Sequence, residues 1–244
     1  MLVTGASRGI GRATAIAFAK EGERVGVHHR NSAELARELV ASLPGSGHAL
    51  LQADLAHAEE CRLLVQEALA ALGGIDVLVN NAGVSLPHDI LKDDFESWRD
   101  AWDQTLAVNL TGPALVTYWA VQEMRRQGGR IINISSRGAF RGEPGQPAYA
   151  ASKAALNAFG QSLAQALAPQ GIAVMTIAPG WVATDMSNEE LKRPRGEEIL
   201  RQSPFGRIAR PEEVAAAAVY FASEAAEFTS GAVLDINGAS YLRT

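Results

Sequence analysis

Short apolar runs alternate with longer amphipathic stretches along almost the whole chain, and this alternation constrains the fold more than any other feature. The apolar runs are rich in Val, Ile and Leu without regular polar positions, which is typical of strands buried on both faces. Strands are expected at 2–6, 24–29, 48–55, 75–83, 130–136, 172–180 and 232–238. Helices are expected at 9–21, 32–42, 57–72, 103–127, 148–168 and 211–222. This order predicts an α/β fold, with a parallel sheet of about seven strands and helices on both faces.

Length and composition favour one globular domain over 1–244, with an irregular polar stretch at 184–210 close to the ligand site. Of the 244 residues, 47% are hydrophobic and 20% are charged. The net charge of −5 argues against a nucleic-acid partner. No apolar run approaches the ~18 residues of a membrane span. A single cysteine, Cys61, and the lack of a visible secretory signal favour a cytoplasmic protein.

The stretch TGASRGIG at 4–11 lies where the first expected strand meets the first expected helix. Glycines at such a junction allow a tight turn and a close approach of backbone to phosphate, at a helix N-terminus that favours negative charge. Gly5 suits the turn, and Gly9 and Gly11 suit contact with a pyrophosphate. Taken alone, the three glycines also fit a plain turn.

Five motifs in the same order make the chain resemble the short-chain dehydrogenase/reductase family. Besides TGASRGIG they are NNAG at 80–83, Asn109 in AVNL, Ser136 in NISS, and Tyr149 with Lys153 in YAASK. PGWVATDM at 179–186 resembles the family's segment after the sixth strand. The resemblance covers essentially the whole chain and implies a Rossmann-type, doubly wound sheet. Within the family, the chain looks closest to the 3-oxoacyl-(acyl carrier protein) reductase-like branch.

The spacing of Tyr149 and Lys153 places both side chains on one face of a helix. A free phenol has a pKa of about 10, and a nearby ammonium and an oxidised nicotinamide are expected to lower it. Tyr149 can then exchange a proton with a substrate oxygen. The resemblance implies that Ser136 hydrogen-bonds this oxygen and that Asn109 positions a water between Lys153 and solvent. A Tyr–Lys pair by itself also fits an ordinary surface helix.

The resemblance also implies which residues hold a nicotinamide dinucleotide. Asp54 and Leu55 are expected to bracket the adenine, and Thr184 to hold the nicotinamide carboxamide. The full expected set is Gly5, Ser7, Arg8, Gly9, Ile10, Gly11, Arg30, Asp54, Leu55, Asn81, Ala82, Gly83, Tyr149, Lys153, Pro179, Gly180 and Thr184.

The second expected strand ends in RVGVHHRNS, with no acid that could bind the ribose hydroxyls of NAD(H). Arg8 and Arg30 instead suit a 2′-phosphate, which favours NADP(H). Glu34 is interpreted as part of a capping box on an Asn31 cap and not as the missing acid. The alternative is that Arg30 is a solvated loop residue and that the cofactor is NAD(H).

These observations favour an NADPH-dependent oxidoreductase that transfers hydride between the cofactor and a small-molecule ketone or alcohol, with a 3-oxoacyl thioester as one candidate. The alternatives are an NAD(P)-dependent alcohol or polyol dehydrogenase and a non-catalytic cofactor-binding regulator. Gln146 and Trp181 are expected to line the substrate pocket, and His88 is a candidate for its border. Arg137 and Arg141 are candidates for attracting an acidic substrate. The histidines show no metal-ligand spacing, so no metal is expected.

The segment 148–168 is dominated by alanine, and the resemblance implies that this helix and the one before it pair across a two-fold axis. A homotetramer is therefore expected, although both helices could also pack only within one subunit. Family members usually carry several residues before TG, whereas only Met1, Leu2 and Val3 precede it here. Two or three apolar residues added ahead of Met1 are expected to lengthen a buried strand and stabilise the fold.

Overall fold

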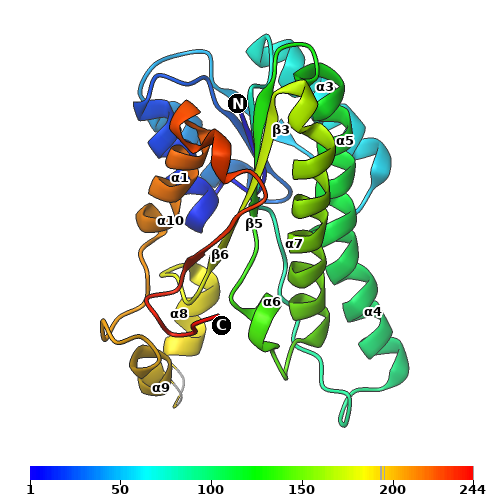
Figure 1. Ribbon diagram of the computed structural model, residues 1–244. Coiled ribbons are helices and arrows are strands. Elements are labelled where there is room, and N and C mark those ends of the chain that lie inside the picture. The colour runs from blue at the N-terminus through cyan, green and yellow to red at the C-terminus, as the bar shows by residue number, and fades with distance from the viewer. Residues whose placement is uncertain (193, 195, 244) are drawn as a thin grey trace.

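The computed structural model describes residues 1–192, 194 and 196–243, and only the backbone of Met186, Asn188 and Glu189. One sheet of seven parallel strands, in the order β3-β2-β1-β4-β5-β6-β7, forms the centre of the molecule (Figure 1). All seven expected strands are present. Their bounds are β1 Leu2–Val3, β2 Gly26–His29, β3 Ala49–Gln52, β4 Val77–Asn80, β5 Gly129–Ile134, β6 Ile172–Pro179 and β7 Val233–Ile236.

Helices cover both faces of the sheet, as the alternation of the sequence predicts (Figure 1). The longer ones are α1 Gly9–Lys20, α2 Ala33–Ser42, α3 Ala58–Leu72, α4 Phe95–Leu106, α5 Gly112–Met124, α7 Pro147–Leu167 and α10 Pro211–Ala222. The short ones are α6 Gly138–Arg141, α8 Asp185–Leu191 and α9 Gly196–Arg201, with 3₁₀ turns at Ala168–Gln170 and Glu224–Thr229. Within the described part of the chain, no helix has the length and apolar character needed to cross a membrane.

Two hydrophobic clusters, one on each side of the sheet, explain why the strands are apolar without alternation. One cluster joins Phe18 of α1, Leu39 of α2 and Phe221 of α10 to Val27 and Val79 in the strands. The other packs α3, α5 and α7 against the opposite strand faces, with Leu64, Val116 and Ala164 as members. Burial of strand side chains on both sides removes the polar positions that a solvent-facing strand would show.

The sheet order reverses at β1, because β2 and β3 lie on one side of it and β4 on the other. A crevice outside the carboxyl ends of the strands is expected at such a switch point. β1 pairs only through Leu2 and Val3, since Gly5 turns the chain away with a φ of 62°. The strand expected at 2–6 is therefore shorter than predicted. The stabilising effect of residues added before Met1 stays a prediction.

Two expectations about helix ends were wrong. The helix expected at 103–127 begins earlier, at Phe95, where the Asp94 carboxylate accepts a hydrogen bond from Ser97 N at 2.8 Å. A π-helical turn at Ala107–Thr111 then separates α4 from α5. Asn31 is not the cap of α2: the helix begins after Ser32, and Glu34 forms an ion pair with Arg37. The interaction three residues along the helix replaces the capping box.

Candidate active site

The glycine turn of the sequence forms a tight loop between β1 and α1. Gly5 and Gly9 have φ values of 62° and 54°, which residues other than glycine rarely adopt. A Cβ on Gly5 would lie 2.9 Å from Ala82 Cα, and a Cβ on Gly11 would overlap the Gly5 carbonyl oxygen. Asn81 Nδ2 donates to the carbonyls of Thr4 and Gly5. The loop and the NNAG segment are thus held against each other.

The N-terminus of α1 is open to an anion. The cap position, Arg8, makes no side-chain cap hydrogen bond, and the first turn of the helix contains no acidic residue. Free N–H groups and a positive helix end suit a pyrophosphate, so this observation fits the dinucleotide expected from the sequence.

His28 braces the glycine loop from β2. Its Nδ1 accepts a hydrogen bond from Gly5 N at 2.9 Å, which assigns the proton to Nε2, 3.1 Å from the Ala53 carbonyl oxygen. The ring is 2% exposed, and this burial lowers the pKa of His28 to about 4. The sequence pointed only to a satisfied or solvent-facing imidazole and gave no sign that it supports the loop.

A polar pocket of about 480 Å³ lies beyond β2 and β3 and is lined by Arg30, Asn31, Gln52, Ala53, Asp54, Glu60 and Glu67. Two of the residues expected at the cofactor, Arg30 and Asp54, lie 3.6 Å apart across it as an ion pair. Glu60 accepts a hydrogen bond from Asp54 N, and Leu55 is buried beside them. Arg30 thus borders the pocket with its side chain 42% exposed and paired with Asp54, and its contact with a 2′-phosphate stays a prediction.

Tyr149 and Lys153 lie on α7, and both face the end of β5. Lys153 Nζ is buried, donates to the Ile134 carbonyl at 2.8 Å and lies 5.9 Å from the centre of the Tyr149 ring. Desolvation lowers the pKa of Lys153 to about 8. Burial also raises the pKa of Tyr149, while the Ser136 hydroxyl acts in the opposite direction. For the chain alone, desolvation thus outweighs the nearby polar groups. The lowering expected from Lys153 together with an oxidised nicotinamide stays a prediction.

Asn109 occupies the π-helical turn between α4 and α5 and uses its amide fully. Nδ2 donates to the Val84 carbonyl at 2.9 Å and to Ser152 Oγ at 3.1 Å, and Oδ1 accepts from Val84 N at 2.8 Å. A Cβ on Gly83 would lie 3.3 Å from Asn109 Oδ1 and 3.4 Å from Lys153 Nζ. The asparagine, the lysine and the NNAG segment thus meet at one point. Such π-turns are frequent at functional sites.

The segment after β6 closes over the same crevice. A Cβ on Gly9 would lie 3.0 Å from Thr184 Cγ2, so Thr184 reaches the glycine loop. The Pro179 carbonyl accepts from Arg137 N, and Gly180 packs against Asn237. Residues from four carboxyl strand ends therefore surround one site. Among the described residues, no group of three or more His, Cys, Asp or Glu side chains is arranged to hold a metal ion.

The family model described as enoyl-(acyl carrier protein) reductase matches residues 5–239. The chain belongs to the short-chain dehydrogenase/reductase family. It is 40% identical to a 3-oxoacyl-[acyl-carrier-protein] reductase from Synechocystis, over 97% of this chain and 94% of that one. It is 36% identical to 3-oxoacyl-[acyl-carrier-protein] reductase FabG from Staphylococcus aureus, over 99% and 97% of the two chains. A crystal structure of a dehydrogenase/reductase from Sinorhizobium meliloti 1021 superposes with a TM-score of 0.90 at 33% identity, covering 99% of this chain and 94% of that one.

Membership of this family makes the chain an oxidoreductase that acts on C=O or CH–OH groups with a nicotinamide cofactor. The structure places the Ser136, Tyr149 and Lys153 side chains around the end of β5, where such a reaction can take place. The Ser136 hydroxyl also accepts from Gly138 N at 3.0 Å, which fixes its position at the start of α6.

His88, a candidate for the border of the substrate cleft, is a buried side chain next to the start of α7. It is 3% exposed and packs edge-on against Trp98 and Trp102 of α4. Its Nδ1 lies 2.8 Å from the Leu86 carbonyl, and its Nε2 accepts from Ala148 N, next to Tyr149. His88 N also donates to the Gly145 carbonyl, and Ser85 donates to Gln146. The segment that follows NNAG therefore holds the N-terminal end of α7.

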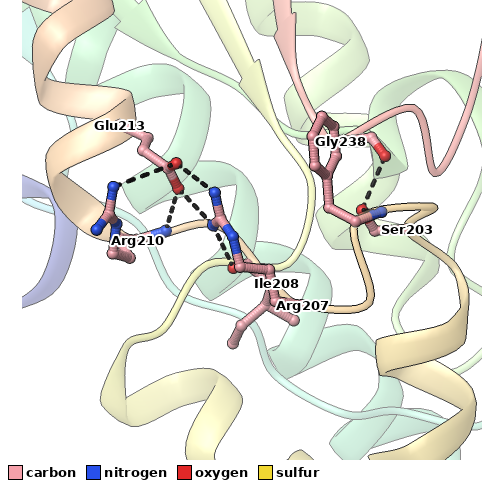
Figure 2. Close-up of polar contacts among 7 residues, drawn as sticks. Ser203, Arg207, Ile208, Arg210, Glu213 and Gly238 are labelled. Atoms are coloured by element: carbon pink, nitrogen blue, oxygen red, sulfur yellow. Dashed lines mark hydrogen bonds and ion pairs between the residues drawn. The ribbon is translucent and has the colours of Figure 1, made fainter.

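The region 184–210, which contains α8 and α9, is attached mainly at its two ends. Val182 and Ala209 form an isolated parallel bridge, in which Ala183 N donates to the Ala209 carbonyl. Figure 2 shows the second attachment: Arg207 and Arg210 pair with Glu213 of α10, and Ser203 donates to the Gly238 carbonyl at 2.8 Å. The backbone of Trp181 accepts from Ala209 N, so this expected pocket residue lies at the base of the region.

Proposed function

We propose that this chain reduces a 3-oxoacyl thioester with NADPH. The observation that carries this proposal is the meeting of the Ser136 hydroxyl, the Tyr149 phenol and the Lys153 ammonium at the end of β5. Desolvation raises the pKa of Tyr149, so the phenol is protonated near neutral pH. A protonated phenol is the donor that a developing alkoxide needs. The substrate class is supported by the names of relatives that share up to 40% identity over nearly the whole chain.

In this proposal Ser136 holds the carbonyl oxygen and Tyr149 donates a proton to it. Lys153, whose ammonium is fixed by the Ile134 carbonyl, steadies the phenolate that remains and binds the cofactor ribose. Asn109 positions the lysine side of the site through Val84 and Ser152. The bound nicotinamide supplies the hydride. The glycine loop, Asn81 and Thr184 hold the cofactor in place.

We also propose NADP(H) over NAD(H). Arg30 faces the polar pocket that follows β2, and Arg8 lies at the open end of α1. Two guanidinium groups suit a 2′-phosphate, whereas NAD(H) needs an acid that the end of β2 lacks. Asp54 lies one strand further and is already paired with Arg30.

The thioester is proposed without a commitment to a carrier protein. Docking of an acidic carrier needs free basic side chains beside the cleft. Arg126 is ion-paired with Glu123, and the glutamine at 127 donates to Asp76. These residues precede β5 and β4, at the amino ends of the strands, whereas the site lies at the carboxyl ends, so they do not support a carrier protein beside the cleft.

The test follows NADPH oxidation with the acetoacetyl thioester of N-acetylcysteamine, a neutral 3-oxoacyl substrate without carrier. We expect turnover that is lost in Tyr149→Phe and a clear preference for NADPH over NADH. Arg30→Ala should reduce the preference for NADPH and leave the rate with NADH nearly unchanged. Lack of thioester reduction by a folded enzyme that reduces other ketones would contradict the proposed substrate.

We further propose a single domain that assembles into a cytoplasmic homotetramer. Strands from both halves of the chain share one sheet, which supports the single domain. Eight of the 21 residues of α7 are Ala, which permits close helix packing, and Tyr118 of α5 is 57% exposed. Light scattering at micromolar concentration checks the assembly, and a monomer contradicts it.

A further inference from the structure

Arg137 is a buried cation with which no carboxylate of the described residues forms an ion pair. The residue is 3% exposed, and Nη1 donates to the Ser240 hydroxyl at 2.6 Å. Its Nε is buried and, among the described residues, has no hydrogen-bond partner, nor does any described carboxylate form an ion pair with the guanidinium. Desolvation lowers the pKa of Arg137, and Arg141 adds to the shift. A buried charge without an ion partner is costly, so the arrangement calls for a functional reason.

The acids around α6 are already paired with other arginines. Glu143 lies 3.3 Å from Arg141, and Asp235 lies 2.7 Å from Arg243. The Arg243 guanidinium also stacks 4.2 Å from the ring of Phe140 in α6. In this part of the described structure, three arginines share two carboxylates, and Arg137 is the one that remains without an acid.

The unpaired arginine directly follows Ser136, the residue proposed to hold the substrate oxygen. Its backbone N donates to the Pro179 carbonyl at 2.8 Å, which fixes it between the ends of β5 and β6. The backbone at residue 137 is thus fixed at the edge of the site, and the bond to the Ser240 hydroxyl fixes Nη1 of the guanidinium. A charge fixed in this way is preorganised for a ligand.

The C-terminal segment covers Arg137 and is linked to the region 184–210. Ser240 contacts the guanidinium, and two residues earlier the Gly238 carbonyl accepts from Ser203 (Figure 2). Ala239, between them, has a φ of 57°, a strained conformation for a residue with a side chain. The region 184–210 is therefore connected through one strained turn to the group that covers Arg137.

We infer that Arg137 binds an anionic group, a carboxylate, on the carbonyl substrate. The Ser240 hydroxyl accepts one hydrogen bond from the guanidinium, and a ligand carboxylate would accept others and supply a negative charge beside it. The inference rests on the proposed carbonyl reduction but not on the thioester. It names the charged part of the substrate and leaves the reacting ketone to Ser136 and Tyr149.

The experiment compares acids with their neutral esters in NADPH oxidation: acetoacetate against ethyl acetoacetate, and 4-oxopentanoate against its ethyl ester. We expect a higher kcat/KM for the acid of at least one pair. Arg137→Met should lower kcat/KM for that acid by roughly 10- to 100-fold, mainly through KM, and leave the ester nearly unchanged. Arg137→Lys, which keeps the charge, should retain part of the preference for the acid.

Arg141→Met is the matched control, because it removes an arginine four residues away that is already paired with Glu143. It should leave the preference for the acid unchanged. The inference is overturned if both esters are preferred by the wild type, or if the acid keeps its advantage in Arg137→Met. Thermal unfolding separates a structural role: Arg137→Met should unfold at the same temperature as the wild type or higher, since it removes an unpaired buried charge. A clear loss of stability in both Arg137 variants would show that the guanidinium is structural.

The failure of the inference is distinguishable from that of the proposed function. An enzyme that reduces the neutral N-acetylcysteamine thioester but shows no Arg137-dependent preference for acids keeps the function and loses the inference. An enzyme that reduces only the acids keeps the inference and loses the thioester as substrate.

Discussion

The catalytic face and the region 184–210 lie on the same crevice but are held by different kinds of contact. On the catalytic face, the Lys153 ammonium and the Asn109 amide bond to buried backbone and side-chain groups. The described attachments of the region 184–210 include the bridge at its base, the Ser203 bond to the Gly238 carbonyl, and ion pairs whose arginines are 50% and 69% exposed. Buried bonds fix geometry strongly, whereas exposed ion pairs contribute little. The reacting groups are thus preorganised, and the substrate-facing region can change without disturbing them.

The largest effect is expected from Tyr149→Phe, which removes the proposed proton donor and keeps the ring. We expect kcat to fall by roughly 10²- to 10⁴-fold, because this is the usual contribution of a general acid. Cofactor affinity, measured by NADPH fluorescence, should stay close to that of the wild type. Near-normal turnover would show that Tyr149 is not the proton donor.

Low pH should destabilise the fold, because unfolding allows His28 to bind a proton. Its pKa in the folded chain is about 4, below the ordinary value of 6.5, so the unfolded chain binds more protons between these values. Stability should therefore be complete above about pH 6.5 and fall by about 3 kcal/mol as the pH drops to about 4.

Urea unfolding at several pH values measures this loss, and His28→Asn is the control. The Asn side-chain oxygen can accept from Gly5 N in place of Nδ1 and does not titrate. Above pH 6.5, the difference in the free energy of unfolding between wild type and variant should no longer change with pH. An equal slope in both proteins between pH 4 and 6.5 would show that other groups cause the loss.

His88→Leu should lower the free energy of unfolding by about 1–3 kcal/mol, because it leaves the Ala148 N–H without its acceptor. We expect a lower kcat with little change in cofactor affinity, since Ala148 adjoins Tyr149. His88→Gln, whose oxygen can reach the position of Nε2, should restore much of the activity.

His48→Leu is the matched variant for His88. It also removes a histidine that accepts from a backbone N–H, here Val25 at 3.2 Å, but at the far end of β2. A similar loss of kcat in His48→Leu would show that general destabilisation, and not the position of α7, explains the His88 result.

The smallest effect is expected at the attachment of the region 184–210. The hydrogen bond from Arg207, and then the one from the Arg210 backbone N–H, lower the pKa of Glu213 to about 2. The contribution of the Glu213 carboxylate to the free energy of unfolding is therefore present above pH 4.5 and is lost as the pH falls toward 2. Glu213→Gln should lower stability by under ~1 kcal/mol and leave kcat unchanged. Glu197→Gln, which breaks the exposed pair with Arg201 in α9, is its control. A large fall in kcat with Glu213→Gln would mean that the region 184–210 also positions the catalytic groups.

Short-range patterns predicted much of the fold and of the site. The seven strands follow from apolar runs, and the family follows from motifs whose residues the fold gathers at the strand ends. The early start of α4 was missed, although Asp94 before Phe95 and three residues before Ser97 is a recognisable cap signal. The cap proposed at Asn31 failed because Glu34 finds a partner along its own helix, in Arg37.

The sequence by itself determined the α/β alternation, the glycine turn, and the Tyr149–Lys153 pair, because each depends on residues a few positions apart. Only the tertiary structure decided that His28 supports Gly5, that His88 holds the start of α7, and that no described carboxylate pairs with Arg137. It also decided the direction of the Tyr149 pKa, which depends on burial. These contacts join segments 23 to 103 positions apart in the chain, and a linear pattern carries no record of which distant groups desolvate or pair with a side chain.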